Sequence, residues 1–210
     1  MDSVSRRLLK ELHDFQRDPS AHPDILELRP MDDEDLLNWR ALIRGAKDTP
    51  YEGGVFEMQI AVPQTYPIQP PTITFVTMIC HPNVHFKTGE ICLDILKTAW
   101  SPAWTLQSTL LAISLLLAHP EPGSPLNCDA ANLLRCGDIE GYNSLVRMYT
   151  QLYAMDHTSV LDAEEEEIVE EEAEVREKYV DEGTDAVEVQ ENKFIGVDGR
   201  AGMVSVGGLS

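Results

Sequence analysis

Cationic residues are scarce in this sequence of 210 residues: 16 lysines and arginines stand against 36 aspartates and glutamates, a net charge of −20. The phosphate backbone of a nucleic acid repels such a chain, so we expect neither DNA nor RNA as a partner. Long apolar runs are also missing, and residues 110–118 fall far short of the roughly 20 residues that cross a bilayer. We therefore expect no direct insertion into a membrane.

Cysteine is rare as well, and its spacing is irregular. The chain has four cysteines, at Cys80, Cys92, Cys128 and Cys136, without the paired spacing of a disulfide framework or a structural zinc site. The opening MDSVSRRLLKEL carries charges too close together for the apolar centre of a secretory signal peptide. These absences indicate a reducing compartment and free thiols.

The order of hydrophobic patterns predicts a helix, then strands, then helices. From residue 3 to Pro19 apolar residues recur at three- and four-residue steps, which predicts an amphipathic helix capped by Ser3 or Ser5. Four short strands are expected at residues 25–30, 38–44, 55–62 and 73–78. Three further helices are expected at residues 106–119, 129–134 and 139–155. This order predicts an α+β fold with helices packed outside an antiparallel meander.

The composition changes abruptly after Met155. Residues 162–174 are nearly all acidic with few apolar side chains, and the remainder, which ends GVDGRAGMVSVGGLS, is rich in glycine and is not expected to pack. We therefore divide the chain into a folded core, residues 1–156, and an acidic tail, residues 157–210, that is disordered or partly helical. The tail is either a solubilising segment or an interaction segment.

Residues 79–104 hold the candidate nucleophile. Cys92 follows a short turn at residues 88–89, and the upstream tripeptide His81-Pro82-Asn83 does not fit a regular helix or a central strand. A thiol on irregular backbone, near a rigid turn that carries an amide, suits nucleophilic catalysis. A small buried cysteine is the commoner case on these residues alone, so both interpretations stay open.

Six motifs lie along the first three-quarters of the chain. They are YEGGVF (51–56), TYPIQPPTITF (65–75), HPN (81–83), GEICLDIL (89–96), WSPAWT (100–105) and SPLN (124–127). Together, and in this order, they resemble the ubiquitin-conjugating enzymes, the E2 family. The resemblance implies the UBC fold: an N-terminal helix, a four-stranded antiparallel meander and C-terminal helices, here followed by the acidic tail. It also favours the catalytic interpretation of Cys92.

The resemblance implies a role for each matching residue of the site. Cys92 corresponds to the thiol that accepts ubiquitin as a thioester from the activating enzyme, E1, and passes it to a substrate. Asn83 corresponds to an amide that either donates to the oxyanion of that transfer or braces the neighbouring loop. His81 corresponds to a residue that fixes the turn. Ser124 occupies a gate position where many members carry an acid that orients the incoming lysine.

Two binding surfaces are implied in the same way. Arg7 and Lys10 match the helix face that binds E1. Ile68 matches the tip of the proline-rich loop and Pro102 with Ala103 match a second loop, which together bind a RING-type ligase, E3. No cofactor and no metal are expected in this chain, because the upstream activating enzyme is the one that uses ATP.

Three features most resemble the peroxisomal branch of the family: one extra residue between Asn83 and Cys92, the tryptophan in WSPAWT, and the run NLLRCGD (132–138). That branch attaches ubiquitin to the peroxisomal import receptor, in some lineages on a cysteine, so that the receptor is recycled. We therefore expect a cytosolic enzyme that a membrane-anchored tether recruits to the cytosolic face of the peroxisome. A general cytosolic or nuclear E2 that serves protein degradation is the alternative.

Three other classes compete with this interpretation. A thiol hydrolase needs a histidine oriented by a third polar group beside Cys92, and the sequence singles out no such set. A metal site of Cys80, His81, His85 and Cys92 has suitable ligand types without the paired spacing of structural zinc. A noncatalytic ubiquitin-binding scaffold of the same fold is disfavoured by the cysteine in GEICLDIL.

Overall fold

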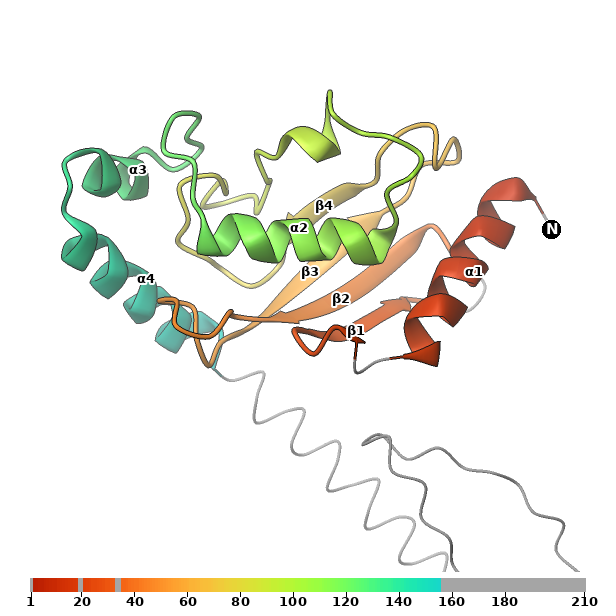
Figure 1. Ribbon diagram of the computed structural model, residues 1–210, viewed down its shortest axis with the longest axis horizontal. Coiled ribbons are helices and arrows are strands. Elements are labelled where there is room, and N and C mark those ends of the chain that lie inside the picture. Colours follow the sequence, from red (N-terminus) through yellow and green to blue (C-terminus); the bar gives the residue numbers. More distant parts are fainter. Residues whose placement is uncertain (1, 19–20, 33–34, 156–210) are drawn as a thin grey trace, which may run out of the picture. The chain divides into compact units, whose positions relative to one another are not determined.

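The computed structural model describes residues 2–18, 21–32 and 35–155, and within them the predicted α+β architecture is confirmed (Figure 1). The elements are α1 (Ser3–Arg17), β1 (Ile25–Pro30), β2 (Asn38–Arg44), β3 (Val55–Ala61), β4 (Thr72–Phe75), the 3-10 helix η2 (Asp94–Leu96), α2 (Leu106–Ala118), α3 (Cys128–Arg135) and α4 (Ile139–Tyr153). The acidic tail lies outside the described residues, so the expected boundary at residue 156 stays a prediction.

The four strands form an antiparallel meander in the order β1-β2-β3-β4. Its fourth strand is shorter than predicted, because the chain turns away directly after Phe75. The amides of Val76 and Thr77 both donate to the Glu57 carbonyl, at 2.9 and 3.3 Å, instead of continuing the ladder. The strand therefore ends where the chain begins its path toward the predicted nucleophile.

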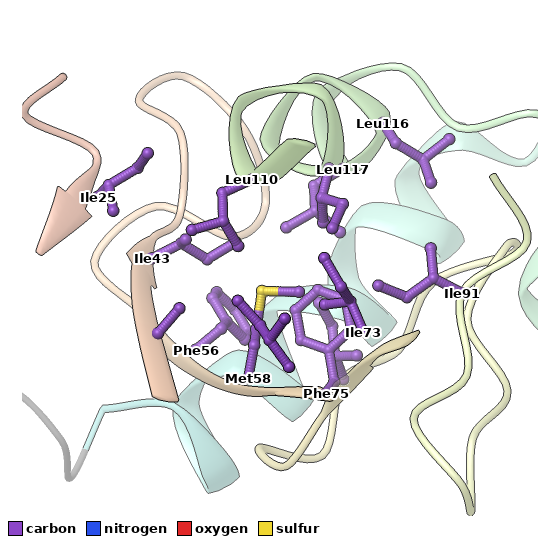
Figure 2. Close-up of a cluster of buried hydrophobic side chains, with 14 of the residues drawn as sticks. Ile25, Ile43, Phe56, Met58, Ile73, Phe75, Ile91, Leu110, Leu116 and Leu117 are labelled. Atoms are coloured by element: carbon purple, nitrogen blue, oxygen red, sulfur yellow. The ribbon is translucent and has the colours of Figure 1, made fainter. Parts of the chain in front are cut away.

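Helix α2 crosses one face of the sheet (Figure 1). Its start is fixed by a capping box, in which Thr105 and Ser108 exchange side-chain and backbone hydrogen bonds. Leu110 and Leu117 of α2 point toward Ile43, Phe56 and Met58 of the sheet, as Figure 2 shows. Burial of these large apolar side chains on both surfaces holds the two layers together. No helix among the described residues is long and apolar enough to cross a membrane.

Helix α1 differs from its prediction in two details. Its N-cap is Asp2, whose Oδ1 accepts a 2.7 Å hydrogen bond from the Ser5 amide. The predicted caps Ser3 and Ser5 are wrong, because the carboxylate of Asp2 reaches the free amide of the third helical residue. The predicted apolar stripe is buried except for Leu12, which is half-buried, and Glu11 is buried in its place.

Candidate active site

Cys92 lies between an isolated β-bridge at Ile91 and the 3-10 helix η2. Its amide donates to the Asn83 carbonyl at 2.8 Å, which fixes the cysteine backbone against the HPN turn. The residue is half-buried, and Lys97 Nζ lies 3.9 Å from its Sγ. The hydrogen-bond partner of the sulfur is thus a lysine, whereas the thiol hydrolase alternative requires a histidine.

A cleft of about 370 Å³ opens beside this cysteine. The residues that matter for its chemistry are Asn83, Cys92, Asp94, His119, Glu121 and Ser124. Cys80, by contrast, is buried, and this burial raises the pKa of its thiol to about 11, with the Asp129 charge adding to the effect. Cys80 is therefore held as a neutral thiol inside the core, whereas Cys92 lines a cleft that a reaction partner can enter.

The Asn83 side chain is buried, and all its polar atoms are engaged in the turn. Its Nδ2 donates to the carbonyls of Glu121, at 2.8 Å, and Ser124, at 3.1 Å, and its Oδ1 accepts from the Glu121 amide at 2.8 Å. Both amide hydrogens are therefore used within the protein. In this conformation the side chain braces the loop that follows α2 and has no donor left for an oxyanion.

His81 is fully buried, and both ring nitrogens have partners. Its Nε2 donates to the Leu116 carbonyl at 3.0 Å, and its Nδ1 accepts from the Asn83 amide at 2.9 Å. Burial lowers the pKa of this imidazole to about 4, against a smaller opposing effect of the Leu116 hydrogen bond. The ring is therefore a neutral, fixed tautomer, which suits a turn-fixing role and neither proton transfer nor metal binding.

No group of three or more His, Cys, Asp or Glu side chains within the described residues is arranged to hold a metal ion. The alternative metal site consisted of Cys80, His81, His85 and Cys92. Cys80 and His81 are both buried, and both ring nitrogens of His81 already form hydrogen bonds within the protein. These residues do not form the alternative metal site.

The two loops predicted to bind a ligase lie side by side. Ile68 at the tip of the proline-rich loop is 77% exposed, and Pro102 and Ala103 of the second loop are exposed as well. The Trp100 indole Nε1 donates to the Pro67 carbonyl at 2.9 Å and ties the loops together. Exposed apolar residues on two joined loop tips form a small apolar surface, which suits the predicted docking of a ligase.

The two residues predicted to bind E1 have different surroundings. Lys10 is exposed. Arg7 is half-buried: its guanidinium pairs with Glu11 and donates to the carbonyls of Trp104, at 3.0 Å, and Pro102, at 3.3 Å. Arg7 thus joins the predicted E1-binding helix to the predicted ligase-binding loop, so part of its side chain is committed to holding the fold.

Glu11, which the sequence analysis did not single out, organises this end of the domain. Its carboxylate pairs with Arg7, accepts from the Tyr66 hydroxyl at 2.8 Å, and accepts from the Leu106 amide at 2.8 Å. Burial raises the pKa of the Tyr66 phenol well above its usual value, so the hydroxyl keeps its proton and remains a donor. We call these contacts the Glu11 node; they join α1, the proline-rich loop and the first turn of α2.

Glu121 is the second residue that was missed, and it lines the same cleft as Cys92. Its position, three residues before Ser124 in a short loop, is the signal that would have directed attention to it. A loop that brings Ser124 to the cleft also brings its near neighbours there.

The chain resembles known proteins over the whole described core. A family model for ubiquitin-conjugating enzymes matches residues 7–150. The chain is 59% identical over 155 residues to protein Peroxin-4 of Arabidopsis thaliana, an alignment that covers 74% of this chain and 98% of that protein. It is 58% identical over 150 residues to the ubiquitin-conjugating enzyme E2 pex4 of Dictyostelium discoideum, with coverage of 71% and 99%.

A solved structure gives the same result. The H. polymorpha ubiquitin conjugating enzyme Pex4p, crystallised in complex with the soluble domain of Pex22p, superposes with a TM-score of 0.70 at 42% identity. The match covers 73% of this chain and 99% of that one. The likeness therefore spans the complete fold of that protein.

Proposed function

The chain belongs to the ubiquitin-conjugating enzyme family and has its UBC fold, and from that premise we propose that it carries ubiquitin as a thioester on Cys92. The observation that supports this role most directly is the placement of Cys92: a half-buried thiol that lines an open cleft and whose backbone is fixed by Asn83. As an E2, the protein acts between an activating enzyme and a ligase.

Charging, the transfer of ubiquitin from the cysteine of E1 to Cys92, is a thiol–thioester exchange. The Cys92 thiolate attacks the ubiquitin carbonyl, a new carbon–sulfur bond forms, and the cysteine of E1 leaves as a thiolate. Because reactant and product are both thioesters, the exchange is close to balanced and needs no strong base beside the sulfur. The site agrees with this requirement, since the buried imidazole of His81 is held neutral and both its nitrogens are engaged.

Discharge, the transfer of ubiquitin from Cys92 to an acceptor, places different demands on the site, because an attacking amine must lose protons in addition to forming a tetrahedral oxyanion at the ubiquitin carbonyl. The Asn83 amide supports this step by bracing the loop from Glu121 to Ser124 against the HPN turn. Direct donation to the oxyanion requires Asn83 to release a hydrogen bond to Glu121 or Ser124. The observed geometry therefore favours the bracing role over oxyanion binding.

A variant of the nucleophile tests the thioester. With E1, ATP and ubiquitin, Cys92→Ser is expected to replace a reductant-labile adduct with a slower, reductant-resistant oxyester. Single replacements of Cys80, Cys128 and Cys136 serve as matched controls and should retain charging. A labile adduct that persists in Cys92→Ala would refute the assignment and leave the family membership intact.

We further propose that the enzyme works at the cytosolic face of the peroxisome, where it modifies the cycling import receptor. Support comes from the Peroxin-4 likeness and from the H. polymorpha enzyme, which forms a complex with the soluble domain of Pex22p. A membrane-anchored partner of that kind raises the effective concentration of the enzyme near its substrate. A general cytosolic E2 remains the alternative function.

Localisation separates the two functions. Purified protein should not sediment with protein-free anionic liposomes, because its negative charge opposes binding to them. In cells it should be recruited to peroxisomal membranes, and deletion of its gene should impair recycling of the import receptor. Uniform distribution with normal receptor recycling would exclude the peroxisomal role.

A further inference from the structure

The cleft beside Cys92 contains two acids, Asp94 and Glu121, although neither is at the gate position. Glu121 and Ser124 both line it, and Glu121 is exposed. No ion pair formed within the described part of the chain involves the Glu121 carboxylate. The carboxylate is therefore available to a cation that enters the cleft.

The backbone of Glu121 is held at a fixed place relative to the nucleophile. Asn83 accepts from its amide through Oδ1 and donates to its carbonyl through Nδ2, both at 2.8 Å. The main-chain carbonyl of Asn83 accepts from the Cys92 amide, also at 2.8 Å. One asparagine thus connects the thiol segment to the acid-bearing loop, and this limits how far the two can move apart.

The two acids of the cleft differ in their electrostatic surroundings. Asp94 begins η2, and Lys97, the residue at the other end of that short helix, places its ammonium 3.9 Å from the Cys92 sulfur. A second ammonium that reached the thioester at Cys92 would be repelled by Lys97, and a carboxylate elsewhere in the cleft would offset that repulsion. The Glu121 carboxylate belongs to the loop after α2, so it offers an incoming cation a separate point of attachment.

We propose that Glu121 receives the ammonium group of an acceptor lysine and thereby performs the task that many family members assign to an acid at the Ser124 position. This inference rests on the proposed thioester at Cys92. It makes Glu121 a specificity-determining residue, because a carboxylate attracts a lysine ammonium and repels a cysteine thiolate.

In this transfer the acceptor nitrogen loses two protons and displaces the Cys92 sulfur from the ubiquitin carbonyl carbon. Glu121 holds the docked ammonium beside the thioester, one nitrogen proton leaves to water, and the freed nitrogen lone pair attacks the ubiquitin carbonyl carbon. A carbon–nitrogen bond forms, the carbon–sulfur bond breaks, and its electron pair stays on the Cys92 sulfur. The second nitrogen proton passes through solvent to that thiolate, so the two protons of the ammonium end on water and on the Cys92 sulfur.

Single-turnover discharge with two acceptors tests the proposal. Full-length protein charged at Cys92 is mixed with Nα-acetyl-lysine methylamide or with N-acetyl-cysteine methylamide. Glu121→Gln should slow transfer to the lysine compound about fivefold, the size of the loss when one exposed ion pair is removed. Transfer to the cysteine compound should be unchanged or faster, charging by E1 should be unchanged, and Glu121→Asp should retain most of the lysine rate.

Three results would overturn the proposal. Unchanged lysine discharge in Glu121→Gln would mean that the carboxylate does not meet the amine. Equal slowing with both acceptors would indicate a structural role in place of charge recognition. If Asp94→Asn lost transfer to the lysine compound while Glu121→Gln transferred at the normal rate, Asp94 would be the residue that receives the ammonium group. Failure of the unmodified protein to charge at all would be a different outcome, since it would refute the proposed thioester itself.

Discussion

Two buried polar side chains, Glu11 and Asn83, each hold together one end of the described domain. Glu11 contacts the first turn of α2, and Asn83 contacts the loop that follows α2. The Glu11 node is ionic: a buried carboxylate meets the Arg7 guanidinium, a phenol and a backbone amide. The Asn83 node, which we define as Asn83 with His81 and their partners, is neutral throughout. The neutral node lies at the candidate nucleophile, where a fixed buried charge would act on every charged intermediate of the transfer.

Substitutions in the two nodes are expected to have different consequences. Removal of the Glu11 carboxylate deprives a half-buried guanidinium, a phenol and a buried amide of one shared acceptor, which costs more than the loss of neutral hydrogen bonds. The ionic node should therefore dominate stability, whereas damage to the neutral node should be smaller in stability and more visible in ubiquitin transfer. Each of the following variants tests one part of this expectation.

The largest loss of stability is expected for Glu11→Ala. It removes the acceptor of Arg7, Tyr66 and the Leu106 amide together, so the free energy of unfolding should fall by roughly 3–5 kcal/mol. Denaturant unfolding measures the effect. Gln16→Ala, at an exposed position of the same helix, is the control and should stay within about 0.5 kcal/mol. A loss below about 1 kcal/mol for Glu11→Ala would show that the ionic node contributes no more than the neutral one.

The pH dependence of stability should identify His81. The folded state holds the imidazole neutral, with its pKa lowered from 6.5 to about 4 by burial, whereas the unfolded chain takes up a proton below about pH 6.5. The contribution is therefore fully present above pH 6.5 and is lost as the pH falls toward 4, by about 3 kcal/mol in total. His81→Gln should unfold with a smaller pH dependence in that window. An identical dependence in the variant would assign the effect to other groups.

A smaller loss of stability is expected for Asn83→Ala, about 1–3 kcal/mol from the unsatisfied groups of the loop. Under the bracing role, discharge slows together with a lower melting temperature. Under oxyanion donation, discharge falls roughly 10²–10³-fold while charging and stability stay nearly intact. Asn83→Asp is the matched variant, because it keeps an acceptor for the Glu121 amide and loses both donors. Equal slowing of charging and discharge would count against both roles.

The sequence predicts the fold well where hydrophobic periodicity is strong. Strands β1, β2 and β3 and helix α2 follow their predicted limits within one residue, and the order of the meander is as expected. The errors in the prediction lie at the ends of helices and strands, such as the N-cap of α1 and the last residues of β4. The end of β4 depends on hydrogen bonds to Glu57, far away in the chain, which local periodicity does not encode.

For the active site, too, the residues in local motifs could be predicted, and those that depend on distant contacts could not. The motif order points to Cys92, Asn83 and the loop tips, and the structure brings Cys92, Asn83 and Ser124 to one cleft. Glu11 was not singled out, because hydrophobic periodicity marks only apolar side chains, although Glu11 lies three residues after Leu8 and four before Phe15, on the buried face. Its partners come from two distant segments, so only the tertiary structure reveals the ion pair.

The smallest effect is expected from removal of the acidic tail. Every contact of the Glu11 and Asn83 nodes described above is made by residues before 156, and the family model ends at residue 150. The acidic run at residues 162–174, which follows the core, also has few apolar side chains with which to cover it. Truncation after Asp156 should therefore change the free energy of unfolding by no more than about 0.5 kcal/mol and leave thioester formation intact. Combining it with Glu11→Ala and with Asn83→Ala extends the test: a truncation that weakened one variant and not the other would show that the tail supports one node, and the two ends would then no longer be independent.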